Sequence, residues 1–308
     1  MNKAKLAAIV GLAAVLAAPA AFAEKYIVIT HTAGTDPFWP VVQRAAEDAA
    51  RDMGVEMEYR HPANGDLVEM ARIVEAATAQ NPAGIVVSLP DASVLGQSVR
   101  DAVAAGIPVV SINSGGDVAR ELGVLAHVGQ PEYEAGLGAG QKHAAMGAKN
   151  ILCLNHEAFN VALEQRCNGY RDGAKADSFE MIDVTSDPAE IKTRTSAALQ
   201  KDSSIDAILA VGPHVCEAAI GALQDLGKEG VIDMGCFDLS PKVVNGIKEG
   251  WFNFAVDQQQ YLQGYMPIVI LKLHNAYGLT PGGDILSGPG FVTNDNVAIV
   301  EQFAGQTR

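Results

Sequence analysis

Polar and aromatic side chains that directly follow short apolar runs are the residues of this sequence best suited to chemistry. They occur in seven places: Asp36-Pro-Phe-Trp39, Ser88-Leu-Pro-Asp91, Asn113-Ser114, Asn155-His156-Glu157, Gly212-Pro-His214, Asp238 and Asp257-Gln258. Aromatic rings pack on the apolar C–H faces of a sugar ring, whereas carboxylates and amides bond fixed hydroxyl groups. A helix start also attracts polar residues as caps, so each place alone is weak evidence. Their recurrence along the chain favours capture of a small, hydroxyl-rich solute.

The segments that must position these residues alternate between strand and helix patterns. The first half predicts strands over 26–30, 55–59, 84–88 and 107–112, with helices over 38–53, 67–79 and 94–105. The alternation restarts after Gly129 and runs to a long helix that ends near residue 276. This rhythm predicts parallel sheets covered by helices on both faces. Ligands of such sheets bind beyond the carboxyl ends of the strands, which is where the polar residues fall.

Length and composition favour two domains. The chain has 308 residues, which exceeds a typical single domain, and its hydrophobic share of 48% is ample for two cores. No low-complexity linker separates the two α/β halves. We therefore expect the chain to cross between the domains more than once.

Charge and the N-terminal segment bear on location and partners. The formal net charge of −14 disfavours nucleic acid and anionic membranes as partners. Lys3 and Lys5 precede an apolar run over 6–18, and Ala21-Phe-Ala23 follows it. This order is typical of a secretory signal peptide with cleavage after Ala23, which would place the protein in the periplasm. The alternative, a transmembrane anchor, is disfavoured because the apolar run is short and Glu24-Lys25 follows at once.

Four cysteines fall in the second half of the chain: Cys153, Cys167, Cys216 and Cys236. An oxidising compartment permits disulfides, but four cysteines allow three complete pairings. Cys153 lies on a predicted strand and Cys167 near the start of the next helix, so these two could be close. Buried free thiols are an equally good interpretation.

Common cofactor and catalytic motifs are not found. The seven histidines have no metal-site spacing, so we expect neither a metal nor a cofactor. The Gly136-Leu-Gly-Ala-Gly140 segment has the wrong spacing for a dinucleotide fingerprint and lies inside a predicted helix, where close helix packing is the better interpretation. No P-loop or Gly-x-Ser-x-Gly elbow is present.

Together, several segments resemble the type I periplasmic binding proteins of the ribose/galactose-binding class, the solute receptors of sugar ABC transporters. The segments are Asp36-Pro-Phe-Trp39, Ile85-Val-Val-Ser-Leu-Pro-Asp91, Gly106-Ile-Pro-Val-Val-Ser-Ile-Asn113, Arg166-Cys-Asn-Gly-Tyr170 and Gly235-Cys-Phe-Asp238. The resemblance covers nearly all of the chain after residue 23. It implies an α/β fold of two Rossmann-like, three-layer domains with parallel sheets, joined by a three-stranded hinge. The expected domains are 24–128 plus 258–288 and 129–257 plus 289–308. The expected partners are a membrane permease and a monosaccharide or cyclic polyol, with the protein itself a monomer.

The resemblance also assigns roles to single residues. Phe38 and Trp39 match aromatics that stack on the sugar ring. Arg166, Asp238 and Gln258 match polar ligand contacts. Four positions depart from ribose binders, which makes ribose a poor guess and favours another aldose, a hexose or an inositol. These positions are Asp36 in place of an asparagine, Asn113 where aspartate is usual, Ser114 in place of an arginine, and Gly212 in place of an asparagine for which His214 could compensate. The remaining expected ligand contacts are Ser88, Asp91, His156 and Asn160.

Structural alternatives exist for most of these residues. Trp39 could pack on the core, Arg166 could form a salt bridge with Glu164 or Glu157, and Asp238 could cap a helix. Ser88 and Asp91 could cap the helix after the third strand. The main rival function is a periplasmic carbohydrate-processing enzyme that uses Asp36 and Asp238 as a carboxylate pair. A lac-repressor-type regulator shares the fold but would need an N-terminal helix-turn-helix.

Overall fold

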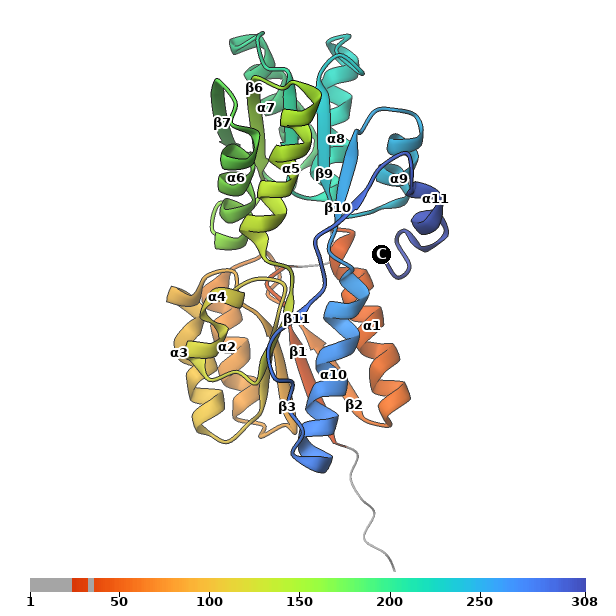
Figure 1. The fold of residues 1–308 in the computed structure, drawn as a ribbon. Helices are drawn as coiled ribbons and strands as arrows, with labels where there is room; N and C mark the ends of the chain where they lie inside the picture. Colours follow the sequence, from red (N-terminus) through yellow and green to blue (C-terminus); the bar gives the residue numbers. More distant parts are fainter. Residues whose placement is uncertain (1–23, 33–35) are drawn as a thin grey trace, which may run out of the picture.

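Two six-stranded sheets form the centre of two α/β lobes, which lie end to end in the computed structural model (Figure 1). The structure describes residues 24–32 and 36–308. The expected signal peptide, 1–23, lies outside the described residues. Among the residues described, no helix is both long and apolar enough to cross a membrane.

The first lobe is built on the sheet β11-β5-β4-β3-β1-β2. Its strands are β1 (Lys25–Ile29), β2 (Glu56–Arg60), β3 (Gly84–Ser88), β4 (Val109–Ile112), β5 (Ala126–Gly129) and β11 (Ile285–Leu286). Its helices are α1 (Phe38–Met53), α2 (Leu67–Thr78), α3 (Ala92–Ala104), α4 (Gly116–Ala119), η1 (Arg120–Leu122) and α10 (Gln260–Tyr277).

The second lobe is built on the sheet β12-β10-β9-β8-β6-β7. Its strands are β6 (Asn150–Asn155), β7 (Ser178–Asp183), β8 (Ala207–Ala210), β9 (Asp233–Phe237), β10 (Phe254–Asp257) and β12 (Gly290–Val292). Its helices are α5 (Glu132–Met146), α6 (Val161–Ala174), α7 (Pro188–Lys201), α8 (Pro213–Asp225), α9 (Pro241–Lys248), α11 (Val297–Val300) and η2 (Glu301–Phe303).

The two sheets repeat one strand order. The second strand of each lobe lies at an edge, followed by the first, third, fourth and fifth, and all of these pairs are parallel. The C-terminal segment then adds β11 parallel to β5 and β12 antiparallel to β10. The predicted class, α/β with two helix-covered parallel sheets, is confirmed.

The chain passes between the two sheets three times: after β5, after β10 and after β11. These passages fall at or beside the expected crossing points. Two strands at the passages, β5 and β11, were not among the predicted strands. Strand β11 has two residues, and β5 has the sequence Ala-His-Val-Gly, which lacks an apolar run. Helix α8 begins at Pro213, since proline suits the first helical position, where its missing N–H would have no partner in the helix.

Glycines bring α5 and α6 into backbone contact. A Cβ on Gly136 or Gly140 would lie 2.1 Å from the carbonyl oxygen of Arg166 or 2.3 Å from that of Tyr170, respectively. From the facing helix, a Cβ on Gly169 or Gly173 would meet backbone at 2.1 Å. The close helix packing predicted for the Gly-x-Gly-x-Gly segment is therefore confirmed.

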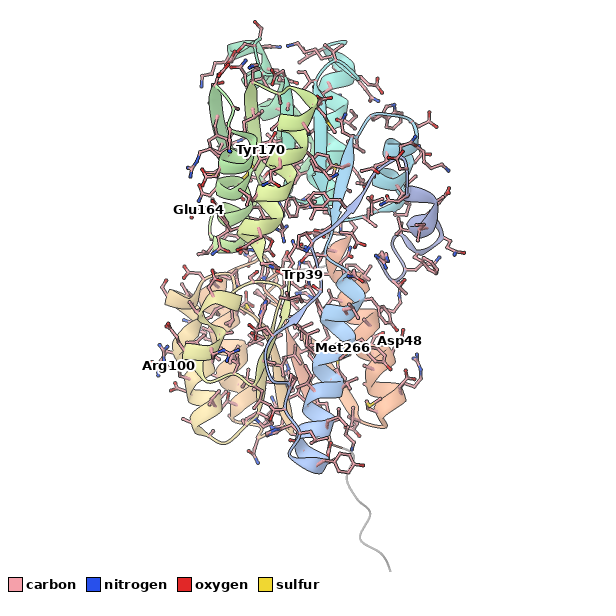
Figure 2. All side chains as sticks on the ribbon, viewed as in Figure 1. Trp39, Asp48, Arg100, Glu164, Tyr170 and Met266 are labelled. Atoms are coloured by element: carbon pink, nitrogen blue, oxygen red, sulfur yellow. A yellow bond between two sulfur atoms is a disulfide. The ribbon has the colours of Figure 1, made fainter. Side chains whose placement is uncertain are left out.

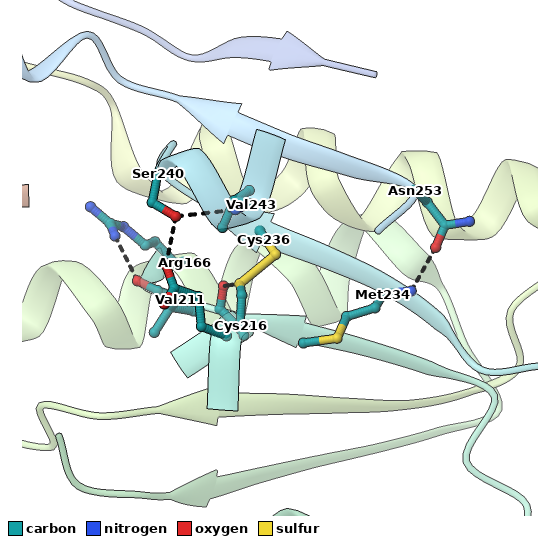
Figure 3. Close-up of a disulfide and its surroundings, with 10 residues drawn as sticks. Arg166, Val211, Cys216, Met234, Cys236, Ser240, Val243 and Asn253 are labelled. Atoms are coloured by element: carbon teal, nitrogen blue, oxygen red, sulfur yellow. Dashed lines mark hydrogen bonds between the residues drawn. A yellow bond between two sulfur atoms is a disulfide. The ribbon is translucent and has the colours of Figure 1, made fainter. Parts of the chain in front are cut away.

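Two disulfides tie helices to the second sheet. Cys153 of β6 is bonded to Cys167 of α6, and Cys216 of α8 is bonded to Cys236 of β9. The alternative of free thiols is thus wrong. In Figure 3, the Cys216–Cys236 bond lies near the carbonyl of Val211 that accepts a hydrogen bond from Arg166.

Candidate functional site

A cavity lies between the carboxyl ends of the two sheets. Both lobes line it, and Trp39 lies between the lobes in Figure 2. Ten of the fourteen expected ligand contacts line the cavity: Asp36, Phe38, Trp39, Asn113, His156, Asn160, Arg166, Gly212, Asp238 and Gln258. The other lining residues are His31, Glu157, Leu163 and Val211. The topology explains the grouping, because parallel strands end at the same edge of a sheet.

The first lobe contributes an aromatic wall. Trp39 meets His31 and Phe38 edge-to-face, each with ring centroids 4.9 Å apart. The carboxylate of Asp36 accepts a hydrogen bond of 3.0 Å from the backbone N–H of Phe38 at the start of α1. Trp39 is almost fully buried and belongs to a core cluster, so one face of the ring system is fixed by packing. The wall can therefore offer a preformed apolar surface to a ring.

Arg166 is the buried cation of the second lobe. Its Nε and Nη2 donate to the two carboxylate oxygens of Glu132 at 2.6 and 2.9 Å. Its Nη1 donates to the Val211 carbonyl at 3.0 Å, as Figure 3 shows. The guanidinium carbon lies 4.4 Å from the centroid of the Phe237 ring. The salt-bridge partners considered from the sequence, Glu164 and Glu157, are thus wrong. Glu132 lies on a different helix, and only the α5–α6 contact brings it near.

The residues that follow the fourth strand of each lobe both form a hydrogen bond with the side chain of Gln258. Asn113 follows β4 and Asp238 follows β9, and both adopt positive φ, at 62° and 68°. Gln258 accepts from the Asn113 amide at 3.4 Å and donates to the Asp238 carboxylate at 3.1 Å. The side chain of Gln263 donates to the same Gln258 oxygen at 2.8 Å, which fixes the orientation of the Gln258 amide. One hinge residue therefore aligns polar groups from both lobes.

Asp238 has an unusual protonation state. Burial raises the pKa of Asp238 to about 8, although Arg166 and the hydrogen bond from Gln258 oppose the rise. Its Oδ1 is buried and has no hydrogen-bond partner within the described part of the chain. A protonated carboxyl group can donate as well as accept a hydrogen bond. It is thus suited to a hydroxyl group.

The side chains of His31 and Glu157 meet across the lobes. The Nε2 of His31 lies 3.3 Å from an oxygen of Glu157, and its Nδ1 lies 2.8 Å from the hydroxyl of Ser88. Burial alone would raise the pKa of Glu157, but attraction to His31 and a hydrogen bond from Asn160 lower it strongly. The carboxylate therefore stays ionised inside the cleft.

His156 and His214 belong to the second lobe and lie beside Asp36 of the first lobe. The two imidazole rings are perpendicular, with centroids 4.6 Å apart, and the Nδ1 of His214 lies 3.6 Å from the Oδ1 of Asp36. Burial lowers the pKa of His156 to about 4. A Cβ on Gly212 would lie 2.7 Å from the His156 ring, so any larger residue at 212 would displace this histidine. The exchange of asparagine for glycine thus makes room for His156.

Four expected ligand contacts do not line the cavity. Ser88 bonds the backbone and ring of His31, Asp91 caps α3, and the Ser114 hydroxyl donates to Asn113. His214 lies behind Asp36 and His156. These side chains support the residues that line the cavity.

Three residues of the site, His31, Glu132 and Glu157, were not among the expected ligand contacts. Glu157 belongs to one of the polar strand-end segments, but its expected role was that of a partner for Arg166. His31 also follows a strand, so the strand-end rule could have found it. Glu132 had no comparable signal, because its partner is on a neighbouring helix.

Comparisons with known proteins agree with this geometry. The sequence profile of a family described as "Periplasmic binding protein domain" matches residues 26–276. The chain is 24% identical over 291 residues to the xylose/arabinose-binding protein of Sulfolobus acidocaldarius, with 89% of this chain and 72% of that protein covered. It is 25% identical over 260 residues to the ribose import binding protein of Escherichia coli, which covers 81% of this chain and 85% of that protein.

A solved structure extends the comparison. The carbohydrate transporter protein of Acidothermus cellulolyticus, solved with myo-inositol, is 34% identical and superimposes with a TM-score of 0.88. The match covers 92% of this chain and 98% of that one. The first two relatives are named as sugar-binding proteins, and the third is named as a carbohydrate transporter. The profile match covers most of the sequence, and the chain therefore belongs to the periplasmic binding protein domain family.

Proposed function

We propose that this protein is the solute receptor of an ABC importer and captures a monosaccharide or cyclic polyol in the cavity between its lobes. One observation carries the proposal: a single cavity lined by both lobes combines an aromatic wall with buried amides, carboxylates and an arginine. Such a set fits a neutral ring that carries many hydroxyls. The fourteen lining residues, with Ser88, Asp91, Ser114 and His214 behind them, are the proposed binding region.

A cyclic polyol is our first candidate within this class. The Acidothermus cellulolyticus protein solved with myo-inositol shares 34% identity over nearly the whole chain. The departures from ribose binders at Asp36, Asn113, Ser114 and Gly212 also speak against ribose. Isothermal titration calorimetry with myo-inositol, D-xylose, L-arabinose, D-galactose and D-ribose tests the class. Failure of all sugars and polyols to bind the purified chain would overturn the proposal.

Hinge closure is the proposed mechanism of capture. We assign 24–128 plus 258–288 and 129–257 plus 289–308 to the two moving domains, because these ranges follow the division of strands between the sheets. A ligand held by both lobes binds the closed form better, and this differential affinity shifts the equilibrium toward closure. Small-angle scattering should show a smaller radius of gyration with the true solute. An unchanged profile at saturation would contradict closure.

The remaining proposals concern location and partners. We expect cleavage after Ala23 to release a monomer into the periplasm, where a membrane permease recognises the closed receptor. N-terminal sequencing of the exported protein should begin at Glu24. The rival enzyme that uses Asp36 and Asp238 has no support from the named relatives, of which two are named as binding proteins and one as a carbohydrate transporter. Incubation with bound sugars should give no product.

A further inference from the structure

A cluster of two histidines and a carboxylate crosses the boundary between the lobes. Asp36 comes from the first lobe, just before α1, whereas His156 follows β6 and His214 lies in the first turn of α8 in the second lobe. One ligand atom of each residue lies within 4.8 Å of the other two. Asp36 and His156 line the solute cavity, and His214 lies behind them.

Several side-chain nitrogen atoms of this cluster have no hydrogen-bond partner in the part of the chain that the structure describes. The Nδ1 atoms of His156 and His214, and the Nε2 of His214, are buried and have no hydrogen-bond partner among the described residues. The Nδ1 of His214 lies 3.6 Å from the Oδ1 of Asp36, an ion-pair distance when His214 is protonated, so the Nδ1 of His156 and the Nε2 of His214 are the two atoms that lack any partner within residues 24–32 and 36–308. Buried polar atoms without a partner are costly and call for an unseen partner.

The same distances suit a metal ion. Zinc bonds to imidazole nitrogen and carboxylate oxygen are about 2.0–2.2 Å, which places neighbouring ligand atoms of a tetrahedron roughly 3.3–3.5 Å apart. The distance between His214 and Asp36, 3.6 Å, is already close to this separation between two ligand atoms of a tetrahedral site. The ligand atoms lie within 4.8 Å of one another, so a contraction of at most roughly 1.5 Å at the longest contact would complete the three-ligand set.

We propose that Asp36, His156 and His214 bind a divalent ion of the Zn²⁺ class between the lobes. Two imidazoles and one carboxylate favour Zn²⁺ and its transition-metal neighbours over Mg²⁺ and Ca²⁺, which prefer oxygen-only ligand sets. A fourth position on the ion faces the cavity, because Asp36 and His156 are part of its wall. The ligands come from three separate segments, which explains why the histidine spacing in the sequence gave no metal motif.

The ion would also link the two lobes. Asp36 and the histidines belong to opposite lobes, so complete coordination requires the closed arrangement. This consequence rests on the proposed hinge closure, whereas metal binding itself does not. Zn²⁺ should therefore lower the radius of gyration in the absence of solute, and Asp36→Asn should weaken that response.

Calorimetric titration of the chelator-treated full chain with ZnCl₂ alone tests the site. We expect one ion per chain and at least about a tenfold loss of affinity in His156→Ala, His214→Ala and Asp36→Asn. His61→Ala is the matched control, because His61 is exposed on the first lobe and should not change the affinity. Mg²⁺ and Ca²⁺ should give no comparable binding. If His214→Ala unfolds, His214→Gln provides a milder replacement.

Cobalt provides a second readout. Co²⁺ in a site of low coordination number should give visible absorption bands that disappear in the three ligand variants and persist in His61→Ala. The proposal is overturned if the chain binds no Zn²⁺ at one ion per chain, or if the ligand variants bind as tightly as the unchanged chain. A chain that binds polyols but not Zn²⁺ would overturn this inference and leave the receptor function intact.

Discussion

The two lobes share one strand order but hold their halves of the cavity in different ways. The first lobe contributes an aromatic wall, Asn113 and one buried carboxylate, Asp36, which are held by core packing and hydrogen bonds. The second lobe contributes the buried ions Glu157 and Arg166, together with Asp238. All four cysteines lie in the second lobe, as do the four glycines that bring α5 and α6 into contact.

The difference follows from the cost of burying charge. An aromatic ring is held in place by apolar burial, which needs no specific orientation of partners. A buried guanidinium needs a carboxylate in matched geometry, and an error in position leaves charges uncompensated. The Cys153–Cys167 bond anchors the helix that carries Arg166, and Cys236 lies two residues before Asp238. The disulfides are thus found in the lobe where a small displacement of Arg166 or Asp238 would leave a buried charged group without its partner.

The largest expected effect is the loss of the buried ion pair. Arg166→Ala should cost about 3–5 kcal/mol of unfolding free energy, because it leaves Glu132 buried without its cation. Urea denaturation measures this cost. The matched change in the first lobe, Lys25→Ala, breaks the exposed pair with Glu58 and should cost less than about 1 kcal/mol.

A double variant separates stability from binding. Adding Glu132→Gln to Arg166→Ala should recover part of the lost stability, since it removes the unpaired carboxylate, but solute affinity should stay at least about tenfold reduced. If the double variant regains full affinity, Arg166 serves only the internal ion pair.

Removal of the Cys153–Cys167 bond is the next effect in size. The double change Cys153→Ala/Cys167→Ala should lower the free energy of unfolding by about 3 kcal/mol, as expected for a loop of roughly 15 residues.

Single-tryptophan variants allow the unfolding of each lobe to be followed by fluorescence, because Trp39 lies in the first lobe and Trp251 in the second. Reductant should lower the unfolding midpoint reported by Trp251 more than that reported by Trp39. Equal shifts would show that the lobes unfold as one unit.

The pKa of Asp238 predicts a pH-dependent effect of intermediate size. The pKa is raised in the folded state to about 8, so stability falls as pH rises from about 4 to about 8, by up to roughly 1.4 kcal/mol per pH unit. Asp238→Asn removes this loss and keeps the left-handed backbone, which asparagine tolerates. The variant should therefore gain stability over the unchanged protein between pH 5 and pH 7, by up to about 3 kcal/mol in denaturation experiments.

The equivalent residue of the first lobe is the control for this pH effect. Asn113→Gly keeps a positive φ and removes no ionisable group, so its stability difference should be constant over the same pH range. A constant difference for Asp238→Asn as well would mean that Asp238 is ionised at neutral pH.

The smallest expected effect concerns the aromatic wall. Trp39→Phe should weaken solute binding by about two- to tenfold, which corresponds to the roughly 0.5–1.5 kcal/mol of an aromatic contact. Calorimetry measures the change. Trp251→Phe, in the second lobe and outside the cavity lining, should leave the affinity unchanged. Equal affinities for both variants would show that Trp39 is only a core residue.

The sequence determined the fold class and most of the cavity lining. The spacing of apolar residues identifies strands and helices locally. The carboxyl ends of parallel strands lie at one edge of a sheet. Asp36, Trp39, Asn113 and Asp238, which follow such strands, could therefore be assigned to one site without coordinates. The spacing of glycines within one predicted helix likewise indicated close packing before any partner helix was known.

Only the tertiary structure decided the pairings. Arg166 with Glu132, His31 with Glu157, and the choice of disulfides depend on which segments fold against each other. Strand β11 has only two residues, and β5 reads Ala-His-Val-Gly, which is not an apolar run that a local pattern identifies. The physical reason is that periodicity reports which face of an element is buried, whereas ion pairs, disulfides and metal ligands depend on distances between elements, which no local pattern encodes.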